Sequence, residues 1–148
     1  MITVDVANQQ TQLPLEEERL EEAVRVALAE TGLPEARISL AVVDDATIGR
    51  LNRRFLGHEG ATDVLSFLLE RTDQCLEGEV VVSAETARRV AAEFGWTPAE
   101  ELLLYVVHGT LHLAGYDDAT AADRVRMRRR ERACLARCGI DNPQGRLS

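Results

Sequence analysis

One stretch of this chain, residues 98–113, limits the possible folds more than any other, because it predicts a helix with almost no polar side. Thr97 followed by Pro98 is a strong helix start, a cap residue and then a proline at the first helical position. Gly115 is the predicted end of the helix. The middle of the segment is apolar on nearly every side, which indicates a helix buried in the core.

Shorter patterns of strands and helices surround this segment. The predicted strands are 2–6, 37–43, 64–67 and 79–83, and the predicted helices are 15–30, a short one from Asp44 or Asp45 to about Phe55, one from a Ser83 cap to Phe94, 98–113 and 121–138. Strands and helices are interleaved without a strict repeat. This order predicts an α+β fold, a mixed four-stranded sheet packed with about five helices.

Length and composition favour one compact domain over residues 1–148. There is no internal repeat or long linker, and a chain of this size needs no metal merely to fold, so a metal would be a clue to function. The longest clean apolar run, 102–107, is far shorter than a membrane span, which takes about 20 residues. The first positive side chain is Arg19, so no secretory signal is expected. The expected location is the cytoplasm.

Two histidines on the buried helix are the strongest candidates for chemistry. His108 and His112 are four residues apart, so both imidazoles lie on one helical face. Gly115 permits a sharp turn, after which Asp118 returns at the spacing by which one class of zinc peptidase supplies its third ligand. Two imidazoles and one carboxylate form a three-ligand set with an open position for water or substrate. The sequence therefore predicts a metal site at the end of this helix.

The residue after the first histidine argues against a peptidase. Zinc peptidases of this pattern place a glutamate there as general base, whereas this chain has Gly109. Glycine cannot accept a proton, so a peptidase would need its base elsewhere. A metal-dependent hydrolase of another bond, such as a peptide bond, stays open as the lesser alternative.

A known family carries a similar run of residues. The stretch 108–118, His-Gly-Thr-Leu-His-Leu-Ala-Gly-Tyr-Asp-Asp, resembles the signature of the bacterial YbeY-type metal-dependent endoribonucleases of rRNA maturation. Leu51-Asn52 and the run Thr-Asp-Val-Leu-Ser-Phe at 62–67 are also similar to that family, as is Gly-Glu-Val at 78–80. The resemblance covers roughly residues 40–138.

This resemblance implies a function and partners. It implies a single-strand-specific endoribonuclease that acts in rRNA 3'-end maturation and ribosome quality control. Zinc, or another divalent transition metal, would bind His108, His112 and Asp118. An rRNA precursor would be the substrate, and the small ribosomal subunit or its assembly factors would be partners. A third alternative is a ribosome-assembly binding module in which the metal is structural.

The chain departs from the family at two positions. The third ligand position, usually histidine, is Asp118, and a carboxylate also binds zinc. A family arginine thought to contact RNA or the reaction centre is replaced by Leu56, and Arg53 or Arg54 nearby is the candidate substitute. Of the two, Arg54 is the one expected to stabilise charge that develops on phosphorus.

The remaining site residues have both a functional and a structural interpretation. Asp63 and Asp117 are candidate general bases, although Asp63 more simply orders a loop and Asp117 more simply orients a histidine. Thr62 and Ser66 are family-derived candidates for the lining of the substrate cleft, and are otherwise ordinary hydrogen-bonding residues. Tyr116 can stack on a base or simply pack beside the helix end.

The net charge of −8 by itself argues against a face that binds nucleic acid. The charge is, however, unevenly distributed along the chain. Residues 1–118 hold nine arginines and 22 acidic residues, a balance of −13, whereas residues 119–148 carry +5. The basic residues of the last helix are Arg124, Arg126, Arg128, Arg129, Arg130, Arg132 and Arg137. This helix is either a solvated face or a surface for RNA or an acidic partner. The acidity of the rest predicts weak affinity for free RNA.

Overall fold

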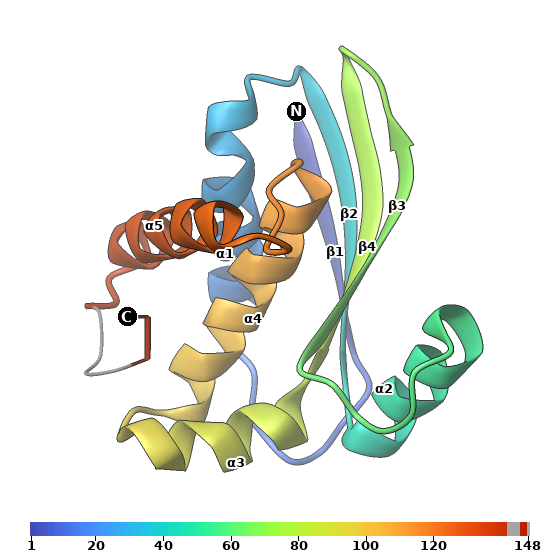
Figure 1. Cartoon of the computed structure of the whole chain (residues 1–148), viewed down its shortest axis with the longest axis vertical. Helices are drawn as coiled ribbons and strands as arrows, with labels where there is room; N and C mark the ends of the chain where they lie inside the picture. The colour runs from blue at the N-terminus through green and yellow to red at the C-terminus, as the bar shows by residue number, and fades with distance from the viewer. Residues whose placement is uncertain (142–145, 148) are drawn as a thin grey trace.

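The computed structural model describes residues 1–141 and 146–147 and shows the predicted interleaving of strands and helices (Figure 1). The elements within these residues are β1 (Ile2–Asn8), α1 (Glu17–Leu28), the 3-10 turn η1 (Ala29–Thr31), β2 (Glu35–Val43), α2 (Asp45–Leu51), the π-helical turn η2 (Asn52–Leu56), β3 (Val64–Arg71), β4 (Cys75–Ser83), α3 (Ala84–Phe94), α4 (Pro98–Leu113) and α5 (Ala121–Arg137). The predicted α+β class is confirmed.

The strands form one mixed sheet with the order β1-β2-β4-β3. β1 pairs parallel to β2 and β2 pairs parallel to β4, whereas β3 pairs antiparallel to β4. β1 and β3 are therefore the edge strands. The position of β3 matters for the site, because α4 crosses the sheet over β3 and β4.

The sheet extends further than the sequence pattern indicates. β4 begins at Cys75 rather than at residue 79, and β3 continues to Arg71 rather than ending at residue 67. Glu77 and Gly78 break the apolar pattern of β4, but their backbones still pair with β2 on one side and β3 on the other. The prediction of the strand ends was wrong because pairing between strands, and not side-chain character, sets them here.

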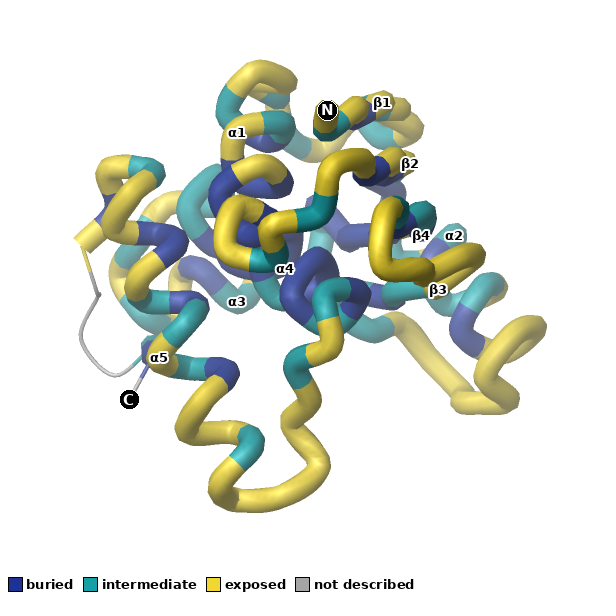
Figure 2. Tube along the Cα trace, turned by 90° about the horizontal axis from the view of Figure 1, so that it is seen from above, coloured by how far each residue is buried: buried dark blue, intermediate teal, exposed yellow. Residues whose placement is uncertain are grey.

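Helices cover the two faces of the sheet unequally. α1 and α4 lie on one face with α3 and α5 packed against them, and α2 lies on the opposite side of the sheet (Figure 1). Figure 2 shows α4 as a largely buried helix in the middle of the molecule. The smaller apolar cluster under α2 is formed by Val43, Ile48, Leu65 and Val81.

The predicted buried helix is confirmed by the side chains of α4. Eleven of its sixteen residues are buried, among them Tyr105 and the charged Glu101. Within the part of the chain that the structure describes, no helix is both long and apolar enough to cross a membrane.

Candidate metal centre

Helix α4 carries both candidate histidines and has well-defined ends. Its first turn is closed by a capping box, in which the Thr97 hydroxyl accepts the Glu100 N–H at 3.2 Å and the Glu100 carboxylate accepts the Thr97 N–H at 3.0 Å. At the other end Gly115 has a φ of +107°, in the region that favours glycine. This turn sends the chain back toward the last two turns of the helix, where the histidines lie.

Three side chains meet at this end of α4. The Nε2 atoms of His108 and His112 are 3.2 Å apart. One carboxylate oxygen of Asp118, Oδ2, is 3.6 Å from the first of these nitrogens and 3.5 Å from the second. Asp118 is 45% exposed, whereas the histidine side chains are 24% and 29% exposed, so the site is open on the side of the carboxylate.

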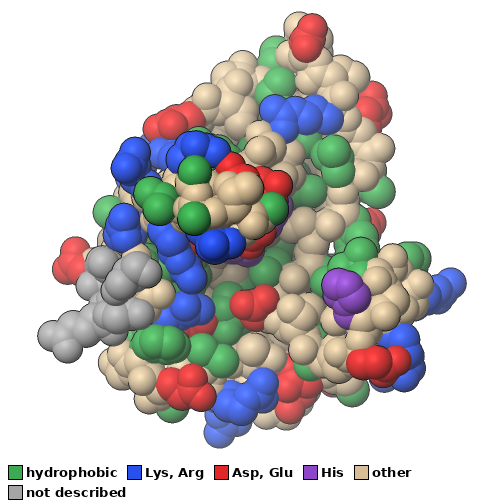
Figure 3. Space-filling view, viewed as in Figure 1, with side chains coloured by type: hydrophobic (Ala, Val, Ile, Leu, Met, Phe, Trp, Pro, Cys, Tyr) green, Lys and Arg blue, Asp and Glu red, His purple; other side chains and the backbone are tan. Residues whose placement is uncertain are grey.

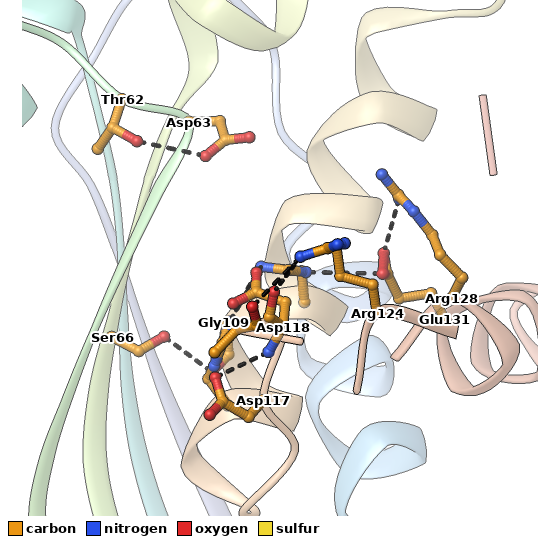
Figure 4. A network of polar contacts seen from close by, with 12 residues as sticks. Thr62, Asp63, Ser66, Gly109, Asp117, Asp118, Arg124, Arg128 and Glu131 are labelled. Carbon is orange, nitrogen blue, oxygen red and sulfur yellow. Dashed lines mark hydrogen bonds and ion pairs between the residues drawn. The ribbon is translucent and has the colours of Figure 1, made fainter. Parts of the chain in front are cut away.

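The loop that delivers Asp118 is held by its own neighbours (Figure 4). The Asp117 carboxylate accepts the backbone N–H of Asp118 at 2.7 Å, and Arg124 donates to the carbonyl oxygens of Asp118 and Ala119 at 3.3 Å each. Thr120 then caps α5 by accepting the N–H of Asp123. Asp117, expected either as a base or as a partner of a histidine, thus lies against the backbone of Asp118, the predicted third ligand.

Gly109 explains the departure from the peptidase pattern. A Cβ atom at this position would lie 2.7 Å from Val80 Cγ1 and 2.8 Å from Val64 Cγ2, so α4 packs on the sheet where it has no side chain. The Ser66 hydroxyl donates to the Gly109 carbonyl oxygen at 2.8 Å across the same contact. A glutamate at 109 has no room and would point into the sheet, away from the histidines.

The other predicted site residues are dispersed. Arg54 lies on η2, next to α2 on the opposite side of the sheet from α4, and its guanidinium stacks 5.2 Å from the centre of the Phe55 ring. Thr62 donates to Asp63 at 3.4 Å just before β3 begins. Tyr116 is half-buried against the main core. None of these three side chains has a hydrogen bond or ion pair with His108, His112 or Asp118 among the described residues.

One carboxylate beside the histidines was missed by the sequence analysis as a site residue. Glu131 on α5 is buried, and its Oε1 atom is 3.6 Å from Nδ1 of His108. The available signal was its charge, since it is the one acidic residue between Arg124 and Arg137. Its contact with the histidine depends on how α5 packs on α4, which no local pattern shows.

The donor set fits a small divalent metal ion. A tetrahedral ion with ligand bonds of about 2.0–2.2 Å has donor atoms roughly 3.3–3.6 Å apart. The three separations in this site, 3.2, 3.5 and 3.6 Å, lie within or about 0.1 Å short of that range. The cluster is the group of three potential metal ligands found within the described residues. Such a set can bind a metal and leave a coordination position open.

Comparison with known proteins gives a consistent family. The profile of the family described as Endoribonuclease YbeY matches residues 5–139. Proteins of that name include one from Moorella thermoacetica, 42% identical over 91% of this chain and 96% of its own length, and one from Desulforamulus reducens, 40% identical over 95% and 99%. A third, from Rhodopirellula baltica, is 45% identical over 84% of this chain, which spans 65% of the length of that relative.

A solved structure has the same overall arrangement. The solution structure of a Thermotoga maritima protein, TM1509, superposes with a TM-score of 0.61 at 25% identity, over 99% of this chain and 100% of that one. The resemblance inferred from the histidine motif is thus confirmed along most of the sequence. The chain belongs to the YbeY endoribonuclease family.

Proposed function

We propose that residues 1–148 act as one metal-dependent endoribonuclease domain that cuts single-stranded RNA. One observation carries the proposal: His108, His112 and Asp118 converge with donor atoms 3.2–3.6 Å apart in a member of an endoribonuclease family. We further propose an rRNA precursor as substrate, with a role in its 3'-end maturation and in ribosome quality control.

Zinc is the proposed metal, with another divalent transition metal as the alternative. Imidazole and carboxylate ligands both suit zinc, and the donor separations agree with tetrahedral coordination. Structural zinc sites are normally closed by four protein ligands, whereas the described residues offer three here. This count favours a catalytic site over a ribosome-assembly module with a structural metal.

The metal and the surrounding residues have separate roles in the proposed cleavage. A divalent ion held by these ligands supplies Lewis-acid chemistry at a phosphodiester bond. Asp117 is the proposed proton acceptor, because Oδ1 bonds the Asp118 N–H whereas Oδ2 has no hydrogen bond among the described residues. Ser66 acts on the reaction through the position of α4, since its hydroxyl already donates to Gly109.

The proposed substrate contacts lie on both faces of the sheet. Arg54 on η2 offers an exposed guanidinium for a phosphate, and the α5 arginines offer more. Figure 3 shows arginine side chains gathered on the side where α5 lies. Tyr116 and Thr62 are kept as candidates for contact with the RNA, secondary to these cations.

The charge distribution favours a ribosomal context. Because residues 1–118 carry a balance of −13, long-range attraction to free RNA is weak. RNA already presented by the small ribosomal subunit or its assembly factors removes the need for such attraction. We therefore propose those particles as partners and the cytoplasm as the location.

The peptidase alternative has less support. It requires a general base near the first histidine, and position 109 has no space for a side chain. An unrelated base would have to come from Asp117 or from a residue outside the motif. We therefore place peptide hydrolysis second.

The test combines metal analysis with cleavage assays on the purified protein. Single-stranded and duplex RNA of the same sequence are compared, together with a peptide library, before and after removal of metal with a chelator. We expect about one zinc per chain and cleavage of the single strand. His112→Ala should lose both, whereas His58→Ala, which changes an exposed loop histidine outside the cluster, should keep both.

Each other result separates the alternatives. Cleavage that survives His112→Ala at the wild-type rate would mean a contaminating nuclease or a different site. Metal binding without cleavage of any RNA or peptide would favour the assembly module. Peptide cleavage without RNA cleavage would reverse the order of the two enzyme proposals.

A further inference from the structure

Glu131 is an unusual residue for the helix that carries it. α5 contains arginines at seven positions from 124 to 137 and a single acidic residue among them. That acidic residue is 1% exposed, although carboxylates are rarely buried without partners. Burying a charge is strongly unfavourable unless it is paired and hydrogen-bonded, so the buried position of Glu131 needs a physical reason.

Only one of the two oxygens of the Glu131 carboxylate has a hydrogen-bond partner among the described residues. Arg128, one turn earlier on α5, donates to Oε2 at 3.3 Å, and its own side chain is 38% exposed. The other oxygen, Oε1, is buried and has no hydrogen-bond partner among the described residues. It faces Nδ1 of His108 on α4 at 3.6 Å. Figure 4 shows Glu131 on α5 together with its partner Arg128.

The two nitrogens of His108 therefore face two different carboxylates. Nε2 faces His112 and Asp118, and Nδ1 faces Glu131. An imidazole that donates its proton from Nδ1 presents a lone pair at Nε2, which is the form that binds a metal. A small movement of either side chain closes the 3.6 Å gap to a charge-assisted hydrogen bond of about 2.8 Å.

We propose that Glu131 is a positioning residue that holds the proton of His108 on Nδ1 and so directs Nε2 toward the metal. This assignment rests on the metal site of the proposed function. The carboxylate also balances charge, because Asp118 alone supplies one negative charge against a divalent ion. Arg128 occupies Oε2 and thereby leaves Oε1 for the histidine.

The Glu131→Gln variant tests this role because Arg128 fixes the orientation of the new amide group. A guanidinium cannot face an amide NH2 group, so Arg128 would draw the amide oxygen toward itself. The NH2 group would then face Nδ1 and donate to it, which favours a proton on Nε2, the wrong atom for metal binding. We expect zinc affinity to fall by about 10- to 100-fold, the usual cost of removing such a partner.

A second change gives a result that a merely structural role would not produce. In the double variant Arg128→Leu/Glu131→Gln the amide is free to rotate and present its oxygen to Nδ1. We expect this double variant to bind zinc more tightly than Glu131→Gln alone. The matched control is Glu30→Gln, which removes an exposed carboxylate that pairs with another α5 arginine, Arg130, at 3.0 Å. Its zinc affinity should equal that of the wild type.

Two measurements decide the outcome: zinc affinity by competition with a chelator, and the protonated ring nitrogen of His108 by long-range proton–nitrogen NMR on the metal-free wild type. We expect the proton on Nδ1. A proton on Nε2, or equal zinc affinity in Glu131→Gln and Glu30→Gln, would overturn the role of Glu131 while the metal site stands. A wild type that binds no zinc would overturn both. The NMR result needs no variant, so it holds even if Glu131→Gln does not fold.

Discussion

The hydroxyl of Ser66 on β3 donates a 2.8 Å hydrogen bond to the carbonyl oxygen of Gly109 on α4, one residue past the first histidine of the site. The missing side chain of Gly109 lets the helix lie directly on Val64 and Val80. This contact sets the height of α4 above the sheet. It therefore also fixes the position of His108 relative to the loop that carries Asp118.

Gly109→Ala should destabilise the protein although alanine is the better helix former. The new Cβ would lie 2.7 Å from Val80 Cγ1, and such overpacking costs about 1–3 kcal/mol, more than the gain of up to about 1 kcal/mol in helix propensity. Urea denaturation measures the difference. Gly49→Ala in α2 is the control, because its nearest neighbour would be at an ordinary 3.6 Å. Equal effects of the two substitutions would contradict the packing argument.

Asp118→His should retain metal binding, and Asp118→Ala should weaken it strongly. The histidine keeps a nitrogen donor in the loop, whereas alanine leaves two ligands, His108 and His112. Titration calorimetry with zinc on metal-free protein gives both affinities. Loss of binding in Asp118→His together with full binding in Asp118→Ala would show that the third ligand is another residue.

Asp45 should stabilise the fold in a pH-dependent way. Burial by itself would raise the pKa of its carboxyl, but hydrogen bonds from Ser83 and Thr86, both 2.6 Å, and from Arg89 outweigh burial and lower the pKa. A carboxyl with a lowered folded-state pKa contributes stability that is present above its unfolded pKa, about 3.9, and is lost as the pH falls through the folded value.

The corresponding variant is Asp45→Asn. We expect it to lose about 1.5–3 kcal/mol at pH 7, the range for hydrogen bonds to a charged group. The difference in free energy of unfolding between the wild type and Asp45→Asn should become smaller below about pH 4. Urea denaturation across pH 3–7 checks both statements. Asp73→Asn, a change at an exposed turn, is the control, and its difference in stability from the wild type should not depend on pH. If the difference for Asp45→Asn is also constant across pH 3–7, its carboxyl does not stabilise the fold in a pH-dependent way.

Arg146 should be needed to keep a buried carboxylate paired. Glu101 is fully buried, and its two oxygens accept from Arg146 at 2.8 and 2.6 Å while Trp96 donates at 2.9 Å. The hydrogen bond to Glu101 raises the pKa of the Arg146 guanidinium. Arg146→Met should cost roughly 3–5 kcal/mol, because it leaves the charge unpaired.

A double variant separates charge from packing at this pair. In Glu101→Gln/Arg146→Met the unpaired charge is gone, so the double variant should be more stable than Arg146→Met alone. Thermal and urea unfolding of both proteins give the comparison. If the double variant is no more stable, Arg146 acts through packing and not through its charge.

Arg54→Ala should reduce the salt dependence of RNA binding. One lost phosphate contact lowers the slope of log K against log salt by about 0.7 for a single strand. Fluorescence anisotropy with a labelled single-stranded RNA between low and moderate salt measures this slope. Arg37→Ala, an exposed change on β2, should leave it unchanged. An unaltered slope for Arg54→Ala would remove Arg54 from the proposed RNA contacts.

Local chemistry was enough to predict α4 and its histidines. The Thr97 cap, the apolar residues at helical spacing and Gly115 act over a few residues, and such short-range rules hold wherever the segment lies. The same spacing placed His108 and His112 on one face, with Asp118 after the turn. The fold class followed from the order of the elements, since the interleaving itself indicates a mixed sheet.

Contacts between distant elements decided the rest. Glu131 meets His108 because α5 packs across α4, although the two residues are 23 positions apart. Arg54 lies across the sheet from α4 because α2 packs on the other face. Gly109 is required because the helix lies directly on β3 and β4. Local propensities carry no information about these contacts, because packing and strand pairing bring together residues that are far apart along the chain.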